Sequence, residues 1–218
     1  MSTWSYSRWS DYATCPALYK FKYLDKYPSP ASPAMARGTK IHELAEGYVT
    51  KQILGLPSQL EKHAEEFAAL RATKGVVAEE EWGFTAEWKP TGYFDHDVWL
   101  RAKCDAAVPR KRTTRVIDYK TGREYPTHQQ QTSLYALAAF FRYPETREVQ
   151  TEFWYVDSGN TVTQGFDRSE VPDMLEVWHA RVEPLMTDTS FQATPGESCR
   201  KYGGCSMGKS KGGPCAFG

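Results

Sequence analysis

The sequence predicts an α/β protein with a mixed central β-sheet flanked by helices. Segments with the apolar spacing of helices fill roughly the first third of the chain and return after the strands. Between them run short segments rich in β-branched and aromatic residues, three in succession and then two, bounded by turn residues. With 218 residues the chain is long enough for one sizeable domain. This order of segments favours helices packed on a sheet.

The N-terminal part is expected to be helical. A first helix is predicted from Ser7 to Leu24, with a kink or break at Pro16, because proline removes a hydrogen bond inside a helix. The proline-rich connector Pro28 to Pro33 separates it from a second helix, Ala34 to Ile53. A third helix, Ser58 to Ala72, begins at a serine of the capping type.

The strands come next. They are predicted at Val76–Thr85, Val98–Val108, Thr113–Asp118, Glu148–Val156 and Thr161–Phe166. Turn clusters at Lys89–Gly92 and Pro109–Arg112 separate the first three. Helices are predicted from Thr127 to Phe141 and from Val171 to Met186. We expect one domain, residues 1–218, made of a helical part (1–75), a core (76–166) and a last helix with a cysteine-rich tail (167–218).

The composition is that of a globular protein and does not reveal a partner. There are 27 Lys and Arg against 27 Asp and Glu, but nucleic-acid binding needs only a local basic stripe. Aromatic residues make up 14%; most are expected in the core, and some could stack on bases. No apolar run approaches the ~20 residues of a membrane span, and the N-terminus lacks a secretory signal. These features predict a cytoplasmic protein without a membrane partner.

The five cysteines are unevenly placed. Cys15 and Cys104 are isolated, whereas Cys199, Cys205 and Cys215 fall within the last twenty residues. An odd number in a chain without a signal peptide argues against a disulfide framework. Clustered thiols in a reducing compartment more often ligate a metal or a cluster.

One strand end combines a carboxylate with an ammonium group. Asp118 and Lys120 are two residues apart, so their side chains project from the same face, and Thr121-Gly122 turns the chain away. Phosphodiester hydrolysis needs oxygen ligands for a divalent ion and a cation near the phosphate. The alternative is an ordinary exposed ion pair.

Two other residues could join this pair. Asp105 lies in an otherwise buried strand, where a lone carboxylate is costly unless it is paired or bound to a cation. A hairpin at Pro109–Arg112 would bring Asp105 close enough to Asp118 to share a metal ion. His42, on the second helix, is a candidate third ligand; alternatively, it is a satisfied structural histidine.

The helix after the Asp118 strand carries Gln131 and Tyr135. They are four residues apart and therefore lie on one helical face. They could bind a phosphate or orient Lys120 and a water molecule. Alternatively, the helix simply packs through Leu134 and Tyr135.

Together these motifs resemble the RecB-like branch of the PD-(D/E)xK nuclease superfamily. The match runs in order through Ser5–Ser7, Tyr12–Pro16, Gly38–His42, Lys103–Asp105, Ile117–Lys120, Gln131–Tyr135 and the three terminal cysteines. It spans nearly the whole chain. The sequence is most similar to the CRISPR-associated single-domain exonucleases and related phage proteins, and beyond those to the nuclease domain of AddB. Each motif is common alone, but the ordered set is specific.

The resemblance implies a restriction-endonuclease-like core that binds Mg²⁺ or Mn²⁺. His42, Asp105 and Asp118 would be ligands, together with the backbone carbonyl of Tyr119. Lys120 would orient the attacking water and stabilise the transition state. Gln131 and Tyr135 match the family's Q-x-x-x-Y motif.

The resemblance also implies a 4Fe–4S cluster, held by Cys15, Cys199, Cys205 and Cys215, that joins the N-terminal helices to the C-terminal tail. Zinc suits four thiolates equally, and a tail with free thiols is a third alternative. The terminal spacing is C-x5-C-x9-C, wider than the C-x2-C of many relatives, and Ala102 replaces the usual glycine before Asp105. Cys104 is expected to pack in the core.

The predicted function is that of a DNA exonuclease acting on ends or single strands in recombination, repair or replication. Its partner would be DNA; a homo-oligomer and recombination or replication proteins stay open as further partners. Two other functions compete with this interpretation. One is a catalytically silent DNA-binding scaffold that keeps the nuclease fold, and the other is a zinc-stabilised DNA-binding protein.

Overall fold

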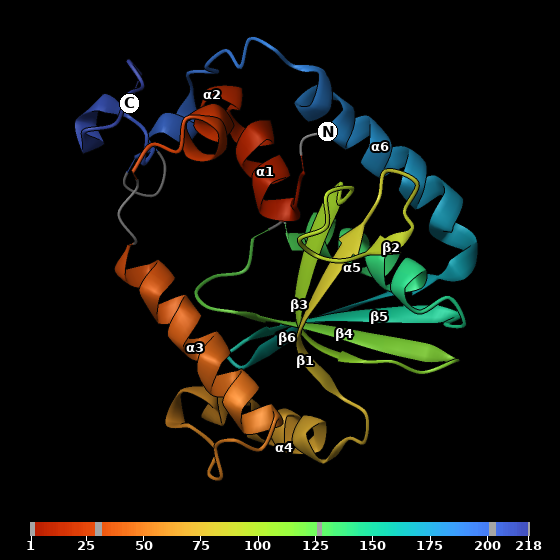
Figure 1. Ribbon diagram of the computed structural model, residues 1–218. Coiled ribbons are helices and arrows are strands. Elements are labelled where there is room, and N and C mark those ends of the chain that lie inside the picture. Colours follow the sequence, from red (N-terminus) through yellow and green to blue (C-terminus); the bar gives the residue numbers. More distant parts are fainter. Residues whose placement is uncertain (1–2, 29–31, 126–127, 201–203, 218) are drawn as a thin grey trace. The chain divides into compact units, whose positions relative to one another are not determined.

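The computed structural model describes residues 3–28, 32–125, 128–200 and 204–217 (Figure 1). It divides into two compact units, residues 32–176 and residues 1–31 with 177–218, and each is described by itself. Two sequence expectations fall outside the described residues: part of the proline-rich connector (29–31) and the helix start at Thr127.

The larger unit contains a six-stranded mixed sheet. Its strand order is β2-β1-β3-β4-β5-β6. The strands are β1 (Val77–Phe84), β2 (Pro90–Thr91), β3 (Leu100–Val108), β4 (Thr113–Lys120), β5 (Glu148–Tyr155) and β6 (Asn160–Asp167). β4 and β5 run parallel, and the other neighbours run antiparallel. The mixed sheet is confirmed, and the short strand β2 lies inside the predicted turn cluster.

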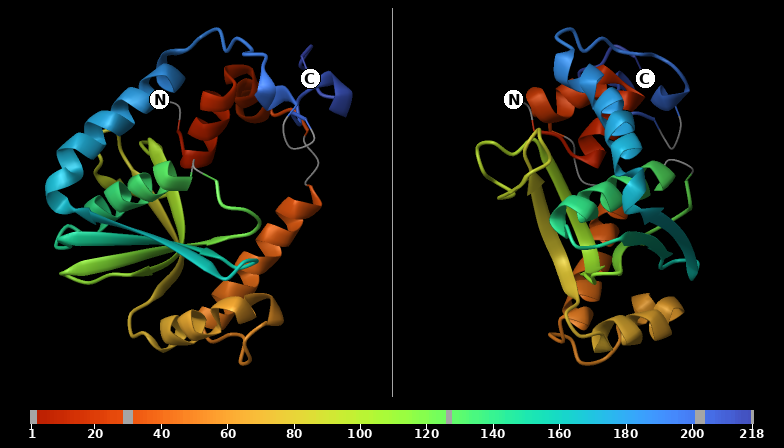
Figure 2. Two further views of the ribbon diagram at one scale, coloured as in Figure 1. Left: turned by 180° about the vertical axis from the view of Figure 1, so that it is seen from behind. Right: turned by 90° about the vertical axis from the view of Figure 1, so that its right-hand side faces the viewer.

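Helices cover both faces of this sheet. Helix α5 (His128–Arg142) connects the parallel strands β4 and β5 and packs on the sheet (Figure 2). Helix α3 (Pro33–Val49) and helix α4 (Ala64–Ala72), which follows a 3₁₀ turn (Ser58–His63), share a core with the side chains of the opposite face. That core includes Ile41, Phe67, Ile117, Tyr119 and Trp154. Helix α3 therefore lies where it can add a side chain to the end of β3.

Strands β3 and β4 pair over a short stretch and then separate. Their register joins Ala106 to Ile117 and Val108 to Arg115. The predicted hairpin is thus confirmed. The backbone pairing between the two strands ends at Ala106. At the next position the Asp105 side chain bridges the strands instead, since its Oδ2 accepts a hydrogen bond from the Tyr119 backbone N–H at 2.5 Å. This separation opens a polar site between the strands.

Strand β1 changes faces at Glu79, which has a positive φ of 52°. Residues two apart in a strand normally share a face. Here Ala78 packs against the core under α3 and α4, whereas Glu80 accepts hydrogen bonds from Arg142 and Tyr143 at the end of α5. A left-handed backbone at a non-glycine residue costs roughly 1–3 kcal/mol and is most often found at functional sites. The left-handed backbone at Glu79 directs its side chain toward His42.

The smaller unit contains the chain's two ends. Helix α1 (Tyr6–Thr14) ends at Cys15, and helix α2 (Pro16–Tyr19) continues into a π-helical turn (Lys20–Leu24), so the predicted break at Pro16 is confirmed. From residue 177, helix α6 (Val171–Thr187) belongs to this unit. Short 3₁₀ turns follow at Glu197–Cys199 and Lys209–Lys211. Among the described residues, no helix combines the length and apolarity needed to cross a membrane.

Aromatic side chains hold the smaller unit together. The Trp4 and Trp178 rings stack at 5.9 Å, and Trp9 meets Trp178 edge-on at 5.2 Å. The Trp9 indole N–H also donates to the Arg181 carbonyl oxygen at 2.9 Å. Many of the tryptophans in the composition are therefore structural.

Candidate active site

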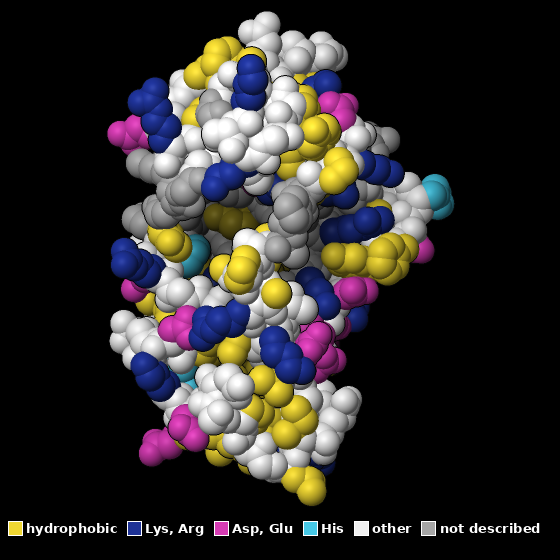
Figure 3. Space-filling model, turned by 90° about the vertical axis from the view of Figure 1, so that its left-hand side faces the viewer, with side chains coloured by type: hydrophobic (Ala, Val, Ile, Leu, Met, Phe, Trp, Pro, Cys, Tyr) yellow, Lys and Arg dark blue, Asp and Glu magenta, His cyan; other side chains and the backbone are white. Residues whose placement is uncertain are grey.

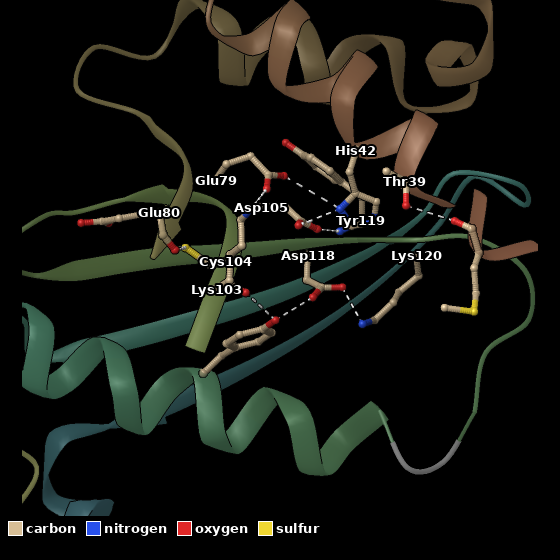
Figure 4. A network of polar contacts seen from close by, with 12 residues as sticks. Thr39, His42, Glu79, Glu80, Lys103, Cys104, Asp105, Asp118, Tyr119 and Lys120 are labelled. Carbon is tan, nitrogen blue, oxygen red and sulfur yellow. Dashed lines mark hydrogen bonds and ion pairs between the residues drawn. The ribbon is translucent and has the colours of Figure 1, made fainter. Parts of the chain in front are cut away.

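Three side chains from three elements meet at the point where β3 and β4 separate (Figure 4). They are His42 on α3, Glu79 on β1 and Asp105 on β3, and one ligand atom from each lies within 4.8 Å of the others. His42 Nδ1 is 2.8 Å from Asp105 Oδ1 and 4.0 Å from Glu79 Oε1. An imidazole with two carboxylates is a suitable donor set for a divalent ion such as Mn²⁺ or Mg²⁺.

The electrostatics of this group favour a bound cation. Asp105 is only 6% exposed, and burial, followed by the charge of Asp118, raises its pKa to about 6. Burial lowers the pKa of His42, but the hydrogen bond to Asp105 and the nearby carboxylates outweigh it, so the pKa lies above its ordinary value. Glu79 Oε1 is buried and accepts no hydrogen bond from the described residues. A cation here would relieve the repulsion between the carboxylates and satisfy this oxygen.

The second half of the site lies on β4 and α5. The Lys120 Nζ is 2.6 Å from Asp118 Oδ2 and donates to Gln131 Oε1 at 2.8 Å. The Tyr135 hydroxyl donates to Asp118 Oδ1 at 3.0 Å, and the Gln131 amide is 3.4 Å from the same oxygen. The Phe153 ring lies 4.6 Å from the Lys120 ammonium. Asp118 and Lys120 are thus held by a hydrogen-bond network and are not a freely exposed ion pair.

The structure brings the sequence-predicted residues together in two sets. His42 and Asp105 form one set, and Asp118, Lys120, Gln131 and Tyr135 form the other. The Tyr119 backbone joins them, because its N–H binds Asp105 and it directly follows Asp118. Asp118 lies outside the group of three that could hold a metal ion, although its charge raises the pKa of both His42 and Asp105.

Sequence reasoning missed Glu79. It stands in a run of three consecutive glutamates, Glu79 to Glu81, and strand alternation places the first and third of these on one face. The backbone turn at Glu79 is what separates this side chain from its neighbours. A weak signal was present, since three carboxylates in a partly buried strand are costly without cationic partners.

The motif order and the geometry agree with a comparison to known families. The family model of the PD-(D/E)XK nuclease superfamily matches residues 3–209. The chain belongs to this nuclease superfamily. Nucleases of this superfamily use divalent metal ions, and the superfamily implies a DNA substrate; in this nuclease the group of His42, Glu79 and Asp105 could hold such an ion.

Solved structures give a coarser likeness. The nuclease is similar to a candidate exonuclease from Eubacterium rectale, with a TM-score of 0.51 and 11% identity over 84% of this chain and 80% of that chain. It is also similar to the protein SSO0001, with a TM-score of 0.42 and 13% identity over 95% of this chain and 84% of that chain. No curated protein matches the sequence.

Four of the nuclease's five cysteines line one pocket in the smaller unit. They are Cys15, Cys199, Cys205 and Cys215, and all are free thiols. Backbone hydrogen bonds fold the tail around this pocket: the Cys205 N–H donates to the Cys199 carbonyl oxygen at 3.0 Å, and the Cys215 N–H donates to the Met207 carbonyl oxygen at 2.9 Å. The fifth cysteine, Cys104, is fully buried in β3, as expected.

Two details concern the cysteines that line this pocket. Burial raises the pKa of Cys15, but hydrogen bonds, chiefly from the Thr194 backbone N–H, lower it more, so the net shift is toward the thiolate. Gly213 passes so close to Met207 that a Cβ atom would lie 2.3 Å from the Met207 backbone. The tail therefore requires glycine there to bring Cys215 back to the pocket.

Proposed function

We propose that this nuclease is a divalent-metal-dependent DNA exonuclease of the RecB-like branch. The observation that carries the proposal is the junction of two polar sets at the separation of β3 and β4. The buried carboxylate of Asp105, paired with the half-buried imidazole of His42, forms one set, and the Lys120 ammonium, fixed by Asp118 and Gln131, forms the other. Metal-assisted phosphodiester hydrolysis is served by a metal site with a fixed cation next to it.

The residues present fit a Mg²⁺ or Mn²⁺ ion. His42, Glu79 and Asp105, whose ligand atoms lie together, would hold it. Asp118 and the backbone carbonyl of Tyr119 would complete the shell, as the family resemblance implies. When bound, such an ion acts as a Lewis acid toward the phosphate and the attacking water. The buried carboxylates would supply its negative ligand shell, which explains why they can lie together inside the fold.

Lys120 would bind the scissile phosphate and orient the attacking water. Its side chain is 18% exposed at the end of β4, so it can reach a substrate while Gln131 and the Phe153 ring fix its position. Fixed cations lower the barrier because they need no reorganisation as charge develops on the phosphate. Gln131 and Tyr135 would act as positioning residues, since they contact Asp118 and Lys120.

The exonuclease mode is supported by the resemblance to single-domain exonucleases and by the candidate exonuclease among the similar structures. Its role would lie in recombination, repair or replication. The test uses linear and covalently closed circular single-stranded DNA of the same sequence, with Mg²⁺ or Mn²⁺ and with EDTA. The proposal predicts that linear DNA is degraded from its ends, that circles are spared, and that EDTA stops the reaction. Equal cutting of the circles would assign an endonuclease instead.

We further infer that the cysteine pocket holds a 4Fe–4S cluster. The four thiols share one pocket, and cysteine thiolates are the usual ligands of such clusters. Zinc, whose tetrahedral sites also take four thiolates, is the alternative that metal analysis would distinguish. The cluster would close a loop of nearly the whole chain and so stabilise the smaller unit.

A further inference from the structure

The loop between β2 and β3 exposes an aromatic pair beside a cation. Phe94 is 76% exposed, and its ring packs edge-on against the Tyr93 ring at 5.0 Å. The Arg101 guanidinium lies 5.2 Å from the Phe94 ring and 5.3 Å from the Tyr93 ring. Within the described part of the chain, Arg101 forms no ion pair, and its buried Nε lacks a hydrogen-bond partner.

The loop is built to hold this pair in place. The Gly92 N–H donates to Asp95 Oδ2 at 2.8 Å, and the Thr91 hydroxyl donates to Asp97 Oδ1 at 2.9 Å. A Cβ atom on Gly92 would lie 2.6 Å from the Asp95 carboxylate, so the turn depends on glycine. The loop's own carboxylates are therefore engaged in its structure, and the aromatic tip is preorganised. A single exposed apolar residue needs no explanation, but a fixed aromatic pair next to an unpaired arginine does.

Arg101, which lies against the aromatic pair, is on the same strand as Asp105 of the candidate active site. Arg101 and Lys103 are two residues apart on β3 and project from one face, because the residues between and beside them are buried. Lys103 Nζ is 2.7 Å from Glu79 Oε2, and Glu79 belongs to the metal-binding group. At ~3.3 Å per residue, Arg101 and Asp105 are roughly 13 Å apart along the strand.

Exposed apolar and basic side chains also lie next to one another on the surface. Figure 3 shows exposed hydrophobic side chains next to lysine and arginine side chains on one face of the molecule. Proteins that hold single strands combine cations for the backbone with aromatic rings for the bases. The loop and strand β3 together supply both parts.

We propose that Phe94, with Tyr93 and Arg101, forms a stacking site for an unpaired base of the DNA substrate, on the loop that leads into the strand carrying Asp105. The Phe94 face would stack on the base, and the Arg101 guanidinium would contact the adjacent phosphate. An intact duplex hides the faces of its bases, so the site selects single strands or frayed ends. This inference rests on the proposed DNA substrate and adds that the bound strand is unpaired.

The test measures binding in EDTA, without catalysis. The probes are a fluorescein-labelled twelve-nucleotide single strand and the matching blunt duplex, followed by fluorescence anisotropy. Phe94→Ala should weaken single-strand binding by about 5- to 140-fold, the range for losing one stacked base, and change duplex binding little. Phe94→Tyr should restore affinity. Leu54→Ala is the matched control, since Leu54 is 88% exposed and lies outside this loop.

Abasic substitution locates the contact. A single abasic nucleotide, moved along the strand, should weaken binding to the wild type at one position, and at that position it should cause no further loss in Phe94→Ala. Arg101→Gln should reduce the slope of log affinity against log salt by about 0.7, the value for one phosphate contact on a single strand. Wild-type affinity in Phe94→Ala, without any sensitive abasic position, would overturn the stacking site.

This experiment separates the stacking site from the proposed activity. If the wild type fails to cut DNA with Mg²⁺ or Mn²⁺ but Phe94→Ala still loses single-strand affinity, the stacking site stands and the catalytic proposal fails. If the wild type cuts DNA and Phe94→Ala binds like the wild type, the catalytic proposal stands and the stacking site fails. Equal weakening of single-strand and duplex binding would also overturn the site, because it would show no selection for an unpaired base.

Discussion

Replacing Asp105 by asparagine should stabilise the metal-free protein at neutral pH while it abolishes divalent-ion binding. The carboxylate is 6% exposed, and its pKa is raised from 3.8 to about 6 by burial and by Asp118. At about 1.4 kcal/mol per pKa unit, the ionised form costs the folded state about 3 kcal/mol. Asparagine keeps an oxygen for the Tyr119 N–H and removes the charge.

The sign of the pH dependence follows from the higher pKa in the folded state. The folded protein binds the Asp105 proton more tightly than the unfolded chain does. The protonated Asp105 carboxyl therefore makes its full contribution to folding stability below about pH 4, and this contribution is lost as the pH rises through about 6. Roughly half of the loss, ~1.5 kcal/mol, falls between pH 5 and pH 8. The raised pKa of His42 acts in the same direction, because it depends on the same carboxylate.

Thermal unfolding followed by circular dichroism tests this prediction. For a chain of this size ~1.5 kcal/mol corresponds to about 3–6 °C in Tm. Asp105→Asn should gain that much relative to the wild type on going from pH 5 to pH 8 without divalent ions. Added Mn²⁺ should raise the Tm of the wild type only. Asp25→Asn, at an exposed aspartate, is the control. An Asp105→Asn variant that is destabilised equally at both pH values would refute the reasoning.

Three other predictions concern the surrounding residues. Gln131→Ala and Tyr135→Phe should slow cleavage by about 10- to 100-fold, because both hold Asp118 and Lys120 in position; in calorimetry they should weaken Mn²⁺ binding less than Glu79→Gln does, since neither touches His42, Glu79 or Asp105. Glu79→Gln should weaken Mn²⁺ binding by about 10- to 100-fold; unchanged affinity would remove Glu79 from the site. Cys15→Ser should yield colourless, less stable protein. The control Cys104→Ser, prepared without air, should stay brown with about four irons per chain. One zinc and no iron in the wild type would contradict the cluster.

Local patterns in the sequence were sufficient for most of the fold. Alternation and turn residues predicted the β3–β4 hairpin, and proline chemistry predicted the break before Pro16, because both depend on neighbouring residues. The two-residue strand β2 was not predicted. It is too short for a periodic signal, and its residues Pro90 and Thr91 are typical of turns.

The candidate site was only partly predictable, because its members meet through tertiary structure. Asp118 and Lys120 share one strand, so alternation placed them together. Glu79 could not be found in this way, since its positive φ reverses the faces of Ala78 and Glu80. The position of Gln131 was predicted from helical spacing, but its contact with Lys120 depends on how α5 packs on the sheet.

Cleavage of end-labelled DNA by matched variants tests the central claim most directly. The assay compares the wild type with Asp118→Ala, Lys120→Ala and the control Lys111→Ala, whose lysine is 86% exposed, in Mg²⁺ or Mn²⁺ and in EDTA. The account predicts metal-dependent cleavage by the wild type and the control, and a loss of about 100-fold or more in the two site variants. Site variants that fold normally and cut at the wild-type rate would contradict it.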